Sequence, residues 1–183
     1  MEEIRIDVTK EGPEAKELAA HYARLIHDFN YSTPFSAREK ELLMQIFENR
    51  IGKNSVVRSP ITMIAPQNVT IGKNVTIMPR CLLMGSGTIT IEDEVRIAPD
   101  VRILSNNHDP YNRNIITCKP VRICHGAWIG AGSYILPGVT VGKYAIVGAA
   151  SVVTHDVEEY TVVAGSPARV VKHLDPNLFP KML

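Results

Sequence analysis

The sequence has little that would indicate a secreted, membrane-bound or nucleic-acid-binding protein. Its three cysteines are odd in number and lack CxxC spacing, so we expect reduced thiols instead of a disulfide framework. The 20 basic and 19 acidic residues nearly balance, which gives no general reason to expect nucleic acid or a membrane surface as a partner. No apolar run approaches the roughly 18 residues needed to span a bilayer. The first seven residues lack the apolar core of a signal peptide, so we expect a cytoplasmic protein.

What the sequence has instead is a six-residue repeat. Steps of six from residue 123 meet a β-branched aliphatic residue each time, at Ile123, Ile129, Ile135, Val141, Val147 and Val153. Small or β-branched residues recur four positions after each of these, and glycine directly follows several. The pattern also occurs upstream, in units that begin at Ile51, Ile71, Ile91 and Ile97. A period of six does not fit the 3.6 residues per turn of an α-helix, but it fits a short strand followed by a tight turn.

Such a repeat predicts an all-β solenoid over residues 51–165. Three units make one triangular coil of about 18 residues, and strands of successive coils pair in parallel. The inward aliphatic side chains then stack into a core, which needs several coils because one coil cannot bury its own face. The period by itself does not determine the handedness of the coil.

The repeat is interrupted in two places. Its phase slips by two residues around Gly85-Ser86-Gly87, which predicts a small bulge or turn. Ile103 and Ile123 stand 20 positions apart instead of six, so roughly 14 extra residues leave the repeat. We therefore expect a protruding excursion loop over residues 105–120.

Helical patterns precede the repeat. An apolar face over residues 13–29 predicts one helix, and a second is predicted over residues 37–49, with Ser36 and Glu39 as a capping box. These helices form an N-terminal appendage, residues 1–50, that caps the first coil or packs along it. Residues 166–183 form a basic C-terminal tail, which we expect to be loosely held from Pro176 onward because it has no periodicity.

In these motifs the chain resembles the hexapeptide-repeat (left-handed β-helix) acyltransferase superfamily, and within it the galactoside and maltose O-acetyltransferases. The resemblance covers about residues 26–174. It rests on the repeats, on Ala127-Trp128-Ile129-Gly130 and on the stretches 135–142 and 162–170. It implies a left-handed parallel β-helix and a homotrimer with sites between subunits. It also implies acetyl transfer from acetyl-CoA, a co-substrate, to a small acceptor such as a sugar, with no metal required.

The excursion loop holds the residue that we expect to be catalytic. His108 lies where the family has its catalytic histidine, and an imidazole suits general-base chemistry near neutral pH. His108 would take the proton of an acceptor hydroxyl while the oxygen attacks the acetyl carbonyl directly, without an acyl-enzyme. Backbone N–H groups near Gly130 and Ala131 could hold the oxyanion. Asp109 either orients the imidazole or forms a turn, and Cys118 as a nucleophile is the rival mechanism.

The resemblance also assigns residues to the two substrates. For CoA, small residues let the pantetheine approach the backbone and basic ones meet phosphates; these residues are Trp128, Ala131, Ala149, Thr154, His155, Arg169 and Lys172. The acceptor would contact Tyr31, Met78, Arg80, Met84 and Ser86. Here the sequence departs from the family, because Met78 replaces an asparagine and Gly85-Ser86 replace acids. An apolar or acidic acceptor is therefore an alternative to a sugar.

Other functions remain open at this point. A noncatalytic scaffold could keep the solenoid without the chemistry, and an acyltransferase could use another acyl donor or an amine acceptor. A γ-class carbonic anhydrase shares the solenoid but needs three histidines around zinc, two of them a few residues apart. His108, His125 and His155 are isolated in the sequence, which disfavours that reading.

Overall fold

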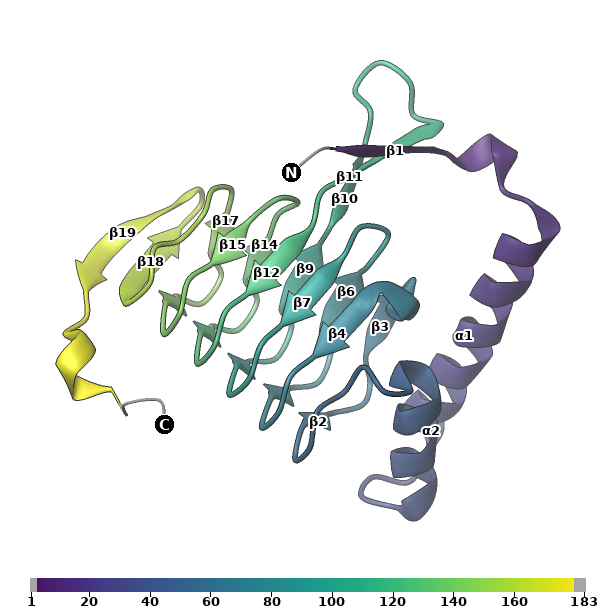
Figure 1. Cartoon of the computed structure of the whole chain (residues 1–183), viewed down its shortest axis with the longest axis horizontal. Coiled ribbons are helices and arrows are strands. Elements are labelled where there is room, and N and C mark those ends of the chain that lie inside the picture. The colour runs from purple at the N-terminus through teal and green to yellow at the C-terminus, as the bar shows by residue number, and fades with distance from the viewer. Residues whose placement is uncertain (1–2, 180–183) are drawn as a thin grey trace.

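The computed structural model describes residues 3–179 and shows a three-sided parallel β-solenoid, capped at one end by two helices (Figure 1). The chain visits three faces in turn. Face 1 consists of β2 (Val56–Val57), β5 (Thr76–Ile77), β8 (Arg96–Ile97), β13 (Trp128–Ile129), β16 (Ile146–Val147), β18 (Thr161–Gly165) and β19 (Ala168–His173). Face 2 consists of β3 (Thr62–Ile64), β6 (Leu82–Met84), β9 (Arg102–Leu104), β14 (Tyr134–Ile135) and β17 (Val152–Val153). Face 3 consists of β4 (Val69–Ile71), β7 (Ile89–Ile91), β12 (Val121–Ile123) and β15 (Thr140–Val141).

The repeat positions form the core as predicted. The five two-residue strands of face 1 each end in a buried aliphatic residue, and β18 has one at its centre. Parallel pairing stacks these residues in a column of Val57, Ile77, Ile97, Ile129, Val147 and Val163. Ile77 and Ile129 are fully buried above and below Ile97. Burial of these β-branched side chains is the main force that holds the coils together.

The coils are not all of the predicted length. Paired residues stand 20 positions apart in the earlier coils, as with Ile77 and Ile97. The spacing is 18 between Ile129 and Val147 and 16 in the last coil, where Val147 pairs with Val163. The predicted slip at residues 85–87 supplies two extra residues between β6 and β7. A second slip, missed in the sequence, lies one coil earlier at the 3-10 helix η2 (Pro66–Asn68).

Glycine is required where successive coils approach most closely. A Cβ on Gly72 would lie 2.4 Å from Oδ1 and 2.6 Å from N of Asp93 in the next coil. That Oδ1 also accepts a hydrogen bond from Lys73 N at 2.7 Å, so the carboxylate is not free to move away.

Replacing Gly72 with alanine is therefore expected to lower the free energy of unfolding by about 1–3 kcal/mol, through overpacking. Urea denaturation measures this loss, with Gly12→Ala as the matched control because a Cβ there meets nothing within 4 Å. Equal denaturation midpoints for the two variants would contradict the close approach.

The N-terminal helices α1 (Pro13–Tyr31) and α2 (Ala37–Phe47) cap the first coil (Figure 1). Phe29, Leu42, Ile46 and Phe47 are buried and join the solenoid core. The Asn30 side chain fixes the end of α1 to the first coil, because it accepts from N of Ile61 and donates to its O, both at 2.8 Å. Ser36 caps α2 as predicted, but the Glu39 carboxylate accepts from Phe35 N instead of Ser36 N, so the capping box is displaced by one residue.

The C-terminal segment is more ordered than predicted. β19 pairs with β18 as an antiparallel strand, and the 3-10 helix η3 (Pro176–Leu178) follows. The Phe179 ring then stacks on Tyr144, with centroids 4.5 Å apart, so the expectation of a loosely held tail is wrong for residues 176–179.

Residues 180–183 lie outside the described part, and the division of the chain at 50/51 and 165/166 stays a prediction. Among residues 3–179, no helix has the length and apolar character needed to cross a membrane.

Candidate active site

The excursion loop leaves the solenoid between β9 and β12, at the edge where face 2 meets face 3. It forms a hairpin of β10 (Asn106–His108) and β11 (Ile115–Cys118), as the antiparallel pairs Asn107–Thr117 and His108–Ile116 show. β1 (Ile4–Asp7), which is followed by the 3-10 helix η1 (Val8–Lys10), pairs antiparallel with the other side of β11 (Figure 1). β1 was not predicted from the sequence, although the alternation of Ile4, Ile6 and Val8 with polar residues is typical of a short strand.

His108 is the last residue of β10, and its side chain is exposed. Its Nδ1 lies 2.6 Å from the backbone oxygen of Arg113. Because a carbonyl oxygen can only accept, Nδ1 carries a proton, and in the neutral imidazole the lone pair is then on Nε2. Nε2 has no hydrogen-bond partner within residues 3–179. The imidazole is thus held in the tautomer that can accept a proton at its free nitrogen.

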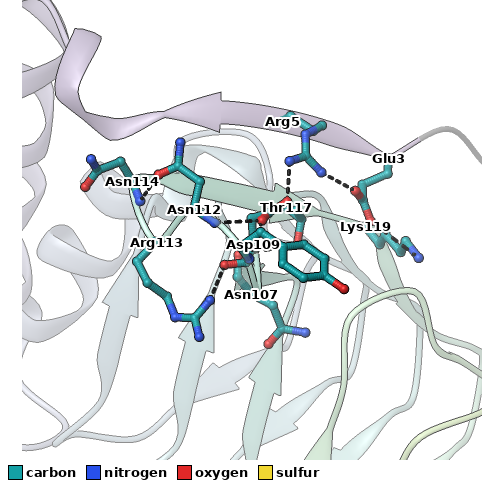
Figure 2. A network of polar contacts seen from close by, with 10 residues as sticks. Glu3, Arg5, Asn107, Asp109, Asn112, Arg113, Asn114, Thr117 and Lys119 are labelled. Carbon is teal, nitrogen blue, oxygen red and sulfur yellow. Dashed lines mark hydrogen bonds and ion pairs between the residues drawn. The ribbon is translucent and has the colours of Figure 1, made fainter.

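Asp109 forms the turn and does not bind the imidazole. Its Oδ1 accepts from Tyr111 N at 2.7 Å and from Asn112 N at 2.9 Å, while Oδ2 pairs with the Arg5 guanidinium (Figure 2). The Arg5 contact first, and the two backbone N–H groups second, lower the pKa of Asp109 to about 2. Of the two roles considered for this residue, the structure therefore favours turn formation.

The lowered pKa of Asp109 predicts how the loop responds to acid. An unfolded aspartate has a pKa near 3.9, so the stabilisation from this carboxylate is complete above about pH 4. It is lost as the pH falls through about 2, where the folded group takes up its proton. NMR titration of the Asp109 carboxyl carbon should show a midpoint near that value in the wild type and a higher one in Arg5→Ala. A wild-type midpoint near 4 would contradict the ion pair.

The cysteines do not offer a nucleophile. Cys118 is buried in β11, and burial raises the pKa of its thiol, as it also does for Cys124. For Cys81 burial raises the pKa to about 11. Because the thiolate is the reactive form, the rival mechanism through Cys118 finds no support in these surroundings.

The predicted ligand residues gather at two edges of the solenoid. Tyr31, Met78, Arg80, Ala131 and Ala149 lie at or beside the edge between faces 1 and 2, with Trp128 half-exposed on the adjoining part of face 1. Met84, Ser86, His108, Thr154 and His155 lie at the edge between faces 2 and 3. Arg169 and Lys172 lie on β19 at the C-terminal end of face 1. Apart from Arg169 and Lys172, the predicted ligand residues of one chain therefore form two separate groups, one at each edge.

Face 2 separates these two groups. About five residues span it, as from Asp100 to Ser105, which corresponds to roughly 16 Å of strand. Of the predicted oxyanion donors, Gly130 N is occupied by Val147 O at 2.8 Å, a bond of the coil ladder. Ala131 N has no partner among residues 3–179, so it is the donor of the two that remains available.

Two side chains predicted to contact ligands already have partners in the fold. Arg80 donates to both carboxylate oxygens of Asp100, at 2.9 and 2.7 Å, which raises the pKa of Arg80. The Thr154 hydroxyl lies 2.9 Å from His155 Nδ1. Arg80 therefore orders the edge at Met78 and has less capacity to bind an acceptor.

A cavity of roughly 450 Å³ lies beside the edge between faces 2 and 3. The side chains of α1 that line it are mostly apolar and include Leu18, Tyr22 and Ile26. Gln67 and Ser86 add polar groups. The Oε1 of Gln67 is buried and has no hydrogen-bond partner among residues 3–179. Ser86 precedes Gly87, whose N–H donates to Ser105 Oγ at the base of the excursion loop. This cavity was not predicted from the sequence, although Ser86 was assigned to acceptor binding.

The histidines do not converge as a zinc site would require. His125 lies at the edge between faces 3 and 1, where its Nε2 is 3.2 Å from the Tyr144 hydroxyl. His108 and His155 lie at another edge, on different coils. Within residues 3–179 no three His, Cys, Asp or Glu side chains are grouped so that they could hold a metal ion. The described residues of one chain therefore do not assemble a zinc site of the carbonic anhydrase type.

Comparison with known proteins agrees with this arrangement. Residues 120–155 match the family described as bacterial transferase hexapeptide (six repeats). The chain is also 31% identical to the galactoside O-acetyltransferase of Escherichia coli K12 over 155 residues, which cover 82% of this chain and 76% of that protein. The chain belongs to the hexapeptide-repeat acetyltransferases. The predicted resemblance is thereby confirmed.

Solved structures of hexapeptide-repeat acetyltransferases share the whole fold. The enzyme of Vibrio cholerae O1 biovar eltor, complexed with acetyl coenzyme A, is 31% identical with a TM-score of 0.85, over 90% of this chain and 91% of that one. A galactoside acetyltransferase in complex with coenzyme A is 28% identical with a TM-score of 0.86, over 92% and 86%. The predicted left-handed parallel β-helix with an N-terminal helical appendage is confirmed, and the protein is an acetyltransferase instead of a noncatalytic scaffold.

Proposed function

We propose that this acetyltransferase transfers the acetyl group of acetyl-CoA to a hydroxyl of a small acceptor, with His108 as the general base. The observation that carries the proposal is the hydrogen bond of His108 Nδ1 to the Arg113 carbonyl. In the neutral ring this bond leaves the lone pair on Nε2, which is what proton abstraction from a bound hydroxyl requires.

The reaction would be a direct attack. His108 Nε2 takes the hydroxyl proton while the acceptor oxygen forms a bond to the acetyl carbonyl carbon. The carbonyl becomes an oxyanion, for which Ala131 N is the available backbone donor. When the oxyanion collapses, the carbon–sulfur bond breaks and the CoA thiolate leaves, taking the proton back from the imidazolium. Atoms and charge balance without a covalent enzyme intermediate.

A homotrimer would unite the two groups of ligand residues. His108 and Ala131 lie at opposite edges of face 2, so one chain cannot present both to the same acetyl group. In a cyclic trimer the contact is heterologous, and one edge of a subunit faces the other edge of its neighbour. We therefore place each active site between subunits, with His108, Thr154 and His155 from one chain and Trp128, Ala131 and Ala149 from the next. Arg169 and Lys172 then supply positive charge for the phosphates of CoA.

The acceptor is proposed to carry an apolar part besides its hydroxyl. Met78 puts apolar surface where the family has an asparagine, and Gly85-Ser86 stand where it has acids. Arg80 is already paired with Asp100. The cavity beside α1, lined by Leu18 and Ile26, adds further apolar surface near the base of the loop. A sugar or related compound with an apolar substituent would suit these surroundings better than a free sugar.

Release of the CoA thiol, followed with a thiol reagent, tests the proposal. The acceptor panel should include free sugars, sugars with apolar aglycones, hydroxylated ring compounds and the amine analogue of each. Acetyl-CoA and succinyl-CoA serve as alternative donors. We expect acceptor-dependent release with acetyl-CoA and a hydroxyl acceptor. Release only with amines, or only with succinyl-CoA, would favour the alternative chemistry and contradict the proposal.

A further inference from the structure

The N-terminal strand β1 is part of the same small sheet as the proposed base. The strand order is β1-β11-β10, so β1 forms one edge of the sheet and β10, which ends at His108, forms the other. Arg5 pairs with Thr117 and Ile6 with Ile116, and Val8 N donates to Asn114 O at 2.9 Å beyond the strand. A segment about 100 residues away in the sequence therefore lies along the whole of β11, the second strand of the excursion loop.

Two ion pairs attach the N-terminal segment to the turn of the excursion loop and to its base. Arg5 contacts the Asp109 carboxylate and also Glu3, at 3.3 Å (Figure 2). Glu3 in turn lies 3.6 Å from Lys119 Nζ, where the chain rejoins the solenoid. Asp109 directly follows the proposed base, so the charge of Arg5 acts where the loop turns.

A continuous series of hydrogen bonds leads from Asp109 to the imidazole. The Asp109 carboxylate accepts from the backbone N–H groups of Tyr111 and Asn112, which closes the turn. The Asp109 carbonyl accepts from Arg113 Nη1 at 2.6 Å, so the far side of the turn is also fixed. The Arg113 carbonyl then accepts from His108 Nδ1. The position of that carbonyl depends on how the Asp109 carboxylate is held.

We infer that Arg5, acting through Asp109, is a positioning residue for His108. Arg5 holds the turn in the shape that places the Arg113 carbonyl against Nδ1, which keeps Nε2 free to accept a proton. The inference rests on the proposed role of His108 as the base. The Arg5 side chain is 51% exposed, so the pair contributes little to global stability and its effect is on local geometry.

Three variants isolate this contact. Arg5→Ala removes the cation. Asp109→Asn keeps an oxygen for Tyr111 N and Asn112 N but removes the negative charge that Arg5 binds. Arg5→Lys restores the charge without the forked geometry. Lys10→Ala is the matched control, because it removes a cation of the same segment that pairs with Asp7 at 3.4 Å and not with the loop.

Kinetics give the first readout. Arg5→Ala and Asp109→Asn should each lower kcat by about 10-fold to 100-fold, with the KM for acetyl-CoA unchanged, because misplacing a reacting group impairs the chemical step. The double variant should be no slower than the slower single variant, since both changes remove one interaction. Arg5→Lys should recover part of the rate, and Lys10→Ala should match the wild type. Multiplicative losses in the double variant would overturn the inference.

The ring nitrogens of His108 give a second readout that needs no turnover. In ¹⁵N NMR spectra above neutral pH, wild-type His108 should be the Nδ1–H tautomer, and Arg5→Ala should shift it toward a mixture. If His108→Ala remains active, the proposed function fails, while the tautomer still tests the positioning. If Arg5→Ala keeps both kcat and the wild-type tautomer while His108→Ala is inactive, Arg5 does not position the base.

Discussion

Replacing His108 with alanine should lower kcat by about 10²-fold to 10⁴-fold, the usual contribution of a positioned general base. The expected loss is in kcat because no other imidazole within residues 3–179 lies on the excursion loop. The dissociation constant of acetyl-CoA should stay the same, since the residues assigned to CoA lie on the solenoid and on β19. Steady-state kinetics and equilibrium binding of acetyl-CoA measure the two quantities separately.

Asn107→Ala is the matched control for this prediction. Asn107 precedes His108 on β10, is also exposed, and points to the opposite side of the strand because side chains alternate. We expect its kcat to remain close to that of the wild type. Loss of acetyl-CoA binding in His108→Ala, or an equal loss of kcat in both variants, would show a disturbed loop instead of a missing base.

Replacing Ile97 with alanine should lower the free energy of unfolding by about 2–5 kcal/mol. Ile97 is 1% exposed in the middle of the face-1 column, and its side chain packs between those of Ile77 and Ile129. The change removes buried methyl groups and leaves a cavity that a stacked backbone cannot readily close. Urea denaturation at a fixed protein concentration measures the loss, because oligomerisation makes stability depend on concentration.

Ile64→Ala removes the same atoms from a position on β3 that is 47% exposed. It should change the free energy of unfolding by no more than about 0.5 kcal/mol, as surface substitutions usually do. If the two isoleucine variants were equally stable, the stacked column could not be the main source of stability.

The repeat made most of the fold predictable. Each aliphatic position fixes one strand and one inward side chain, so a run of six from Ile123 to Val153 determined coil, pairing and core together. Coil length was less predictable. The two residues added at η2 lie in the turn between β3 and β4. The repeat units before and after this turn each keep the six-residue pattern, so the pattern does not reveal the insertion.

The loop was located from the sequence, but its contacts were not. The 20 positions between Ile103 and Ile123 showed where the chain leaves the solenoid. β11 pairs with β1, a four-residue strand more than 100 positions earlier. The residues of the two strands do not by themselves indicate that these strands pair with each other. Asp109 illustrates the consequence, because its place beside His108 allowed two roles and its ion pair with the distant Arg5 could not be predicted from the sequence.

The proposed active site needs a second chain, which a single sequence does not display. The residues predicted for CoA and for proton transfer stay a prediction, and in one chain they lie at two edges separated by face 2. Their union in one site depends on how copies of the chain assemble.

Mixing two inactive variants is the most direct test of an active site shared between two subunits. His108→Ala disables one edge of the subunit, and Ala149→Trp blocks the CoA slot at the other; both positions are exposed, so both variants should fold. After the two are unfolded together and refolded, random trimers should recover roughly a quarter of the wild-type activity, because some sites then combine two intact edges. Refolding either variant alone should recover none. An inactive mixture with the sedimentation behaviour of the wild type would contradict an active site shared between subunits.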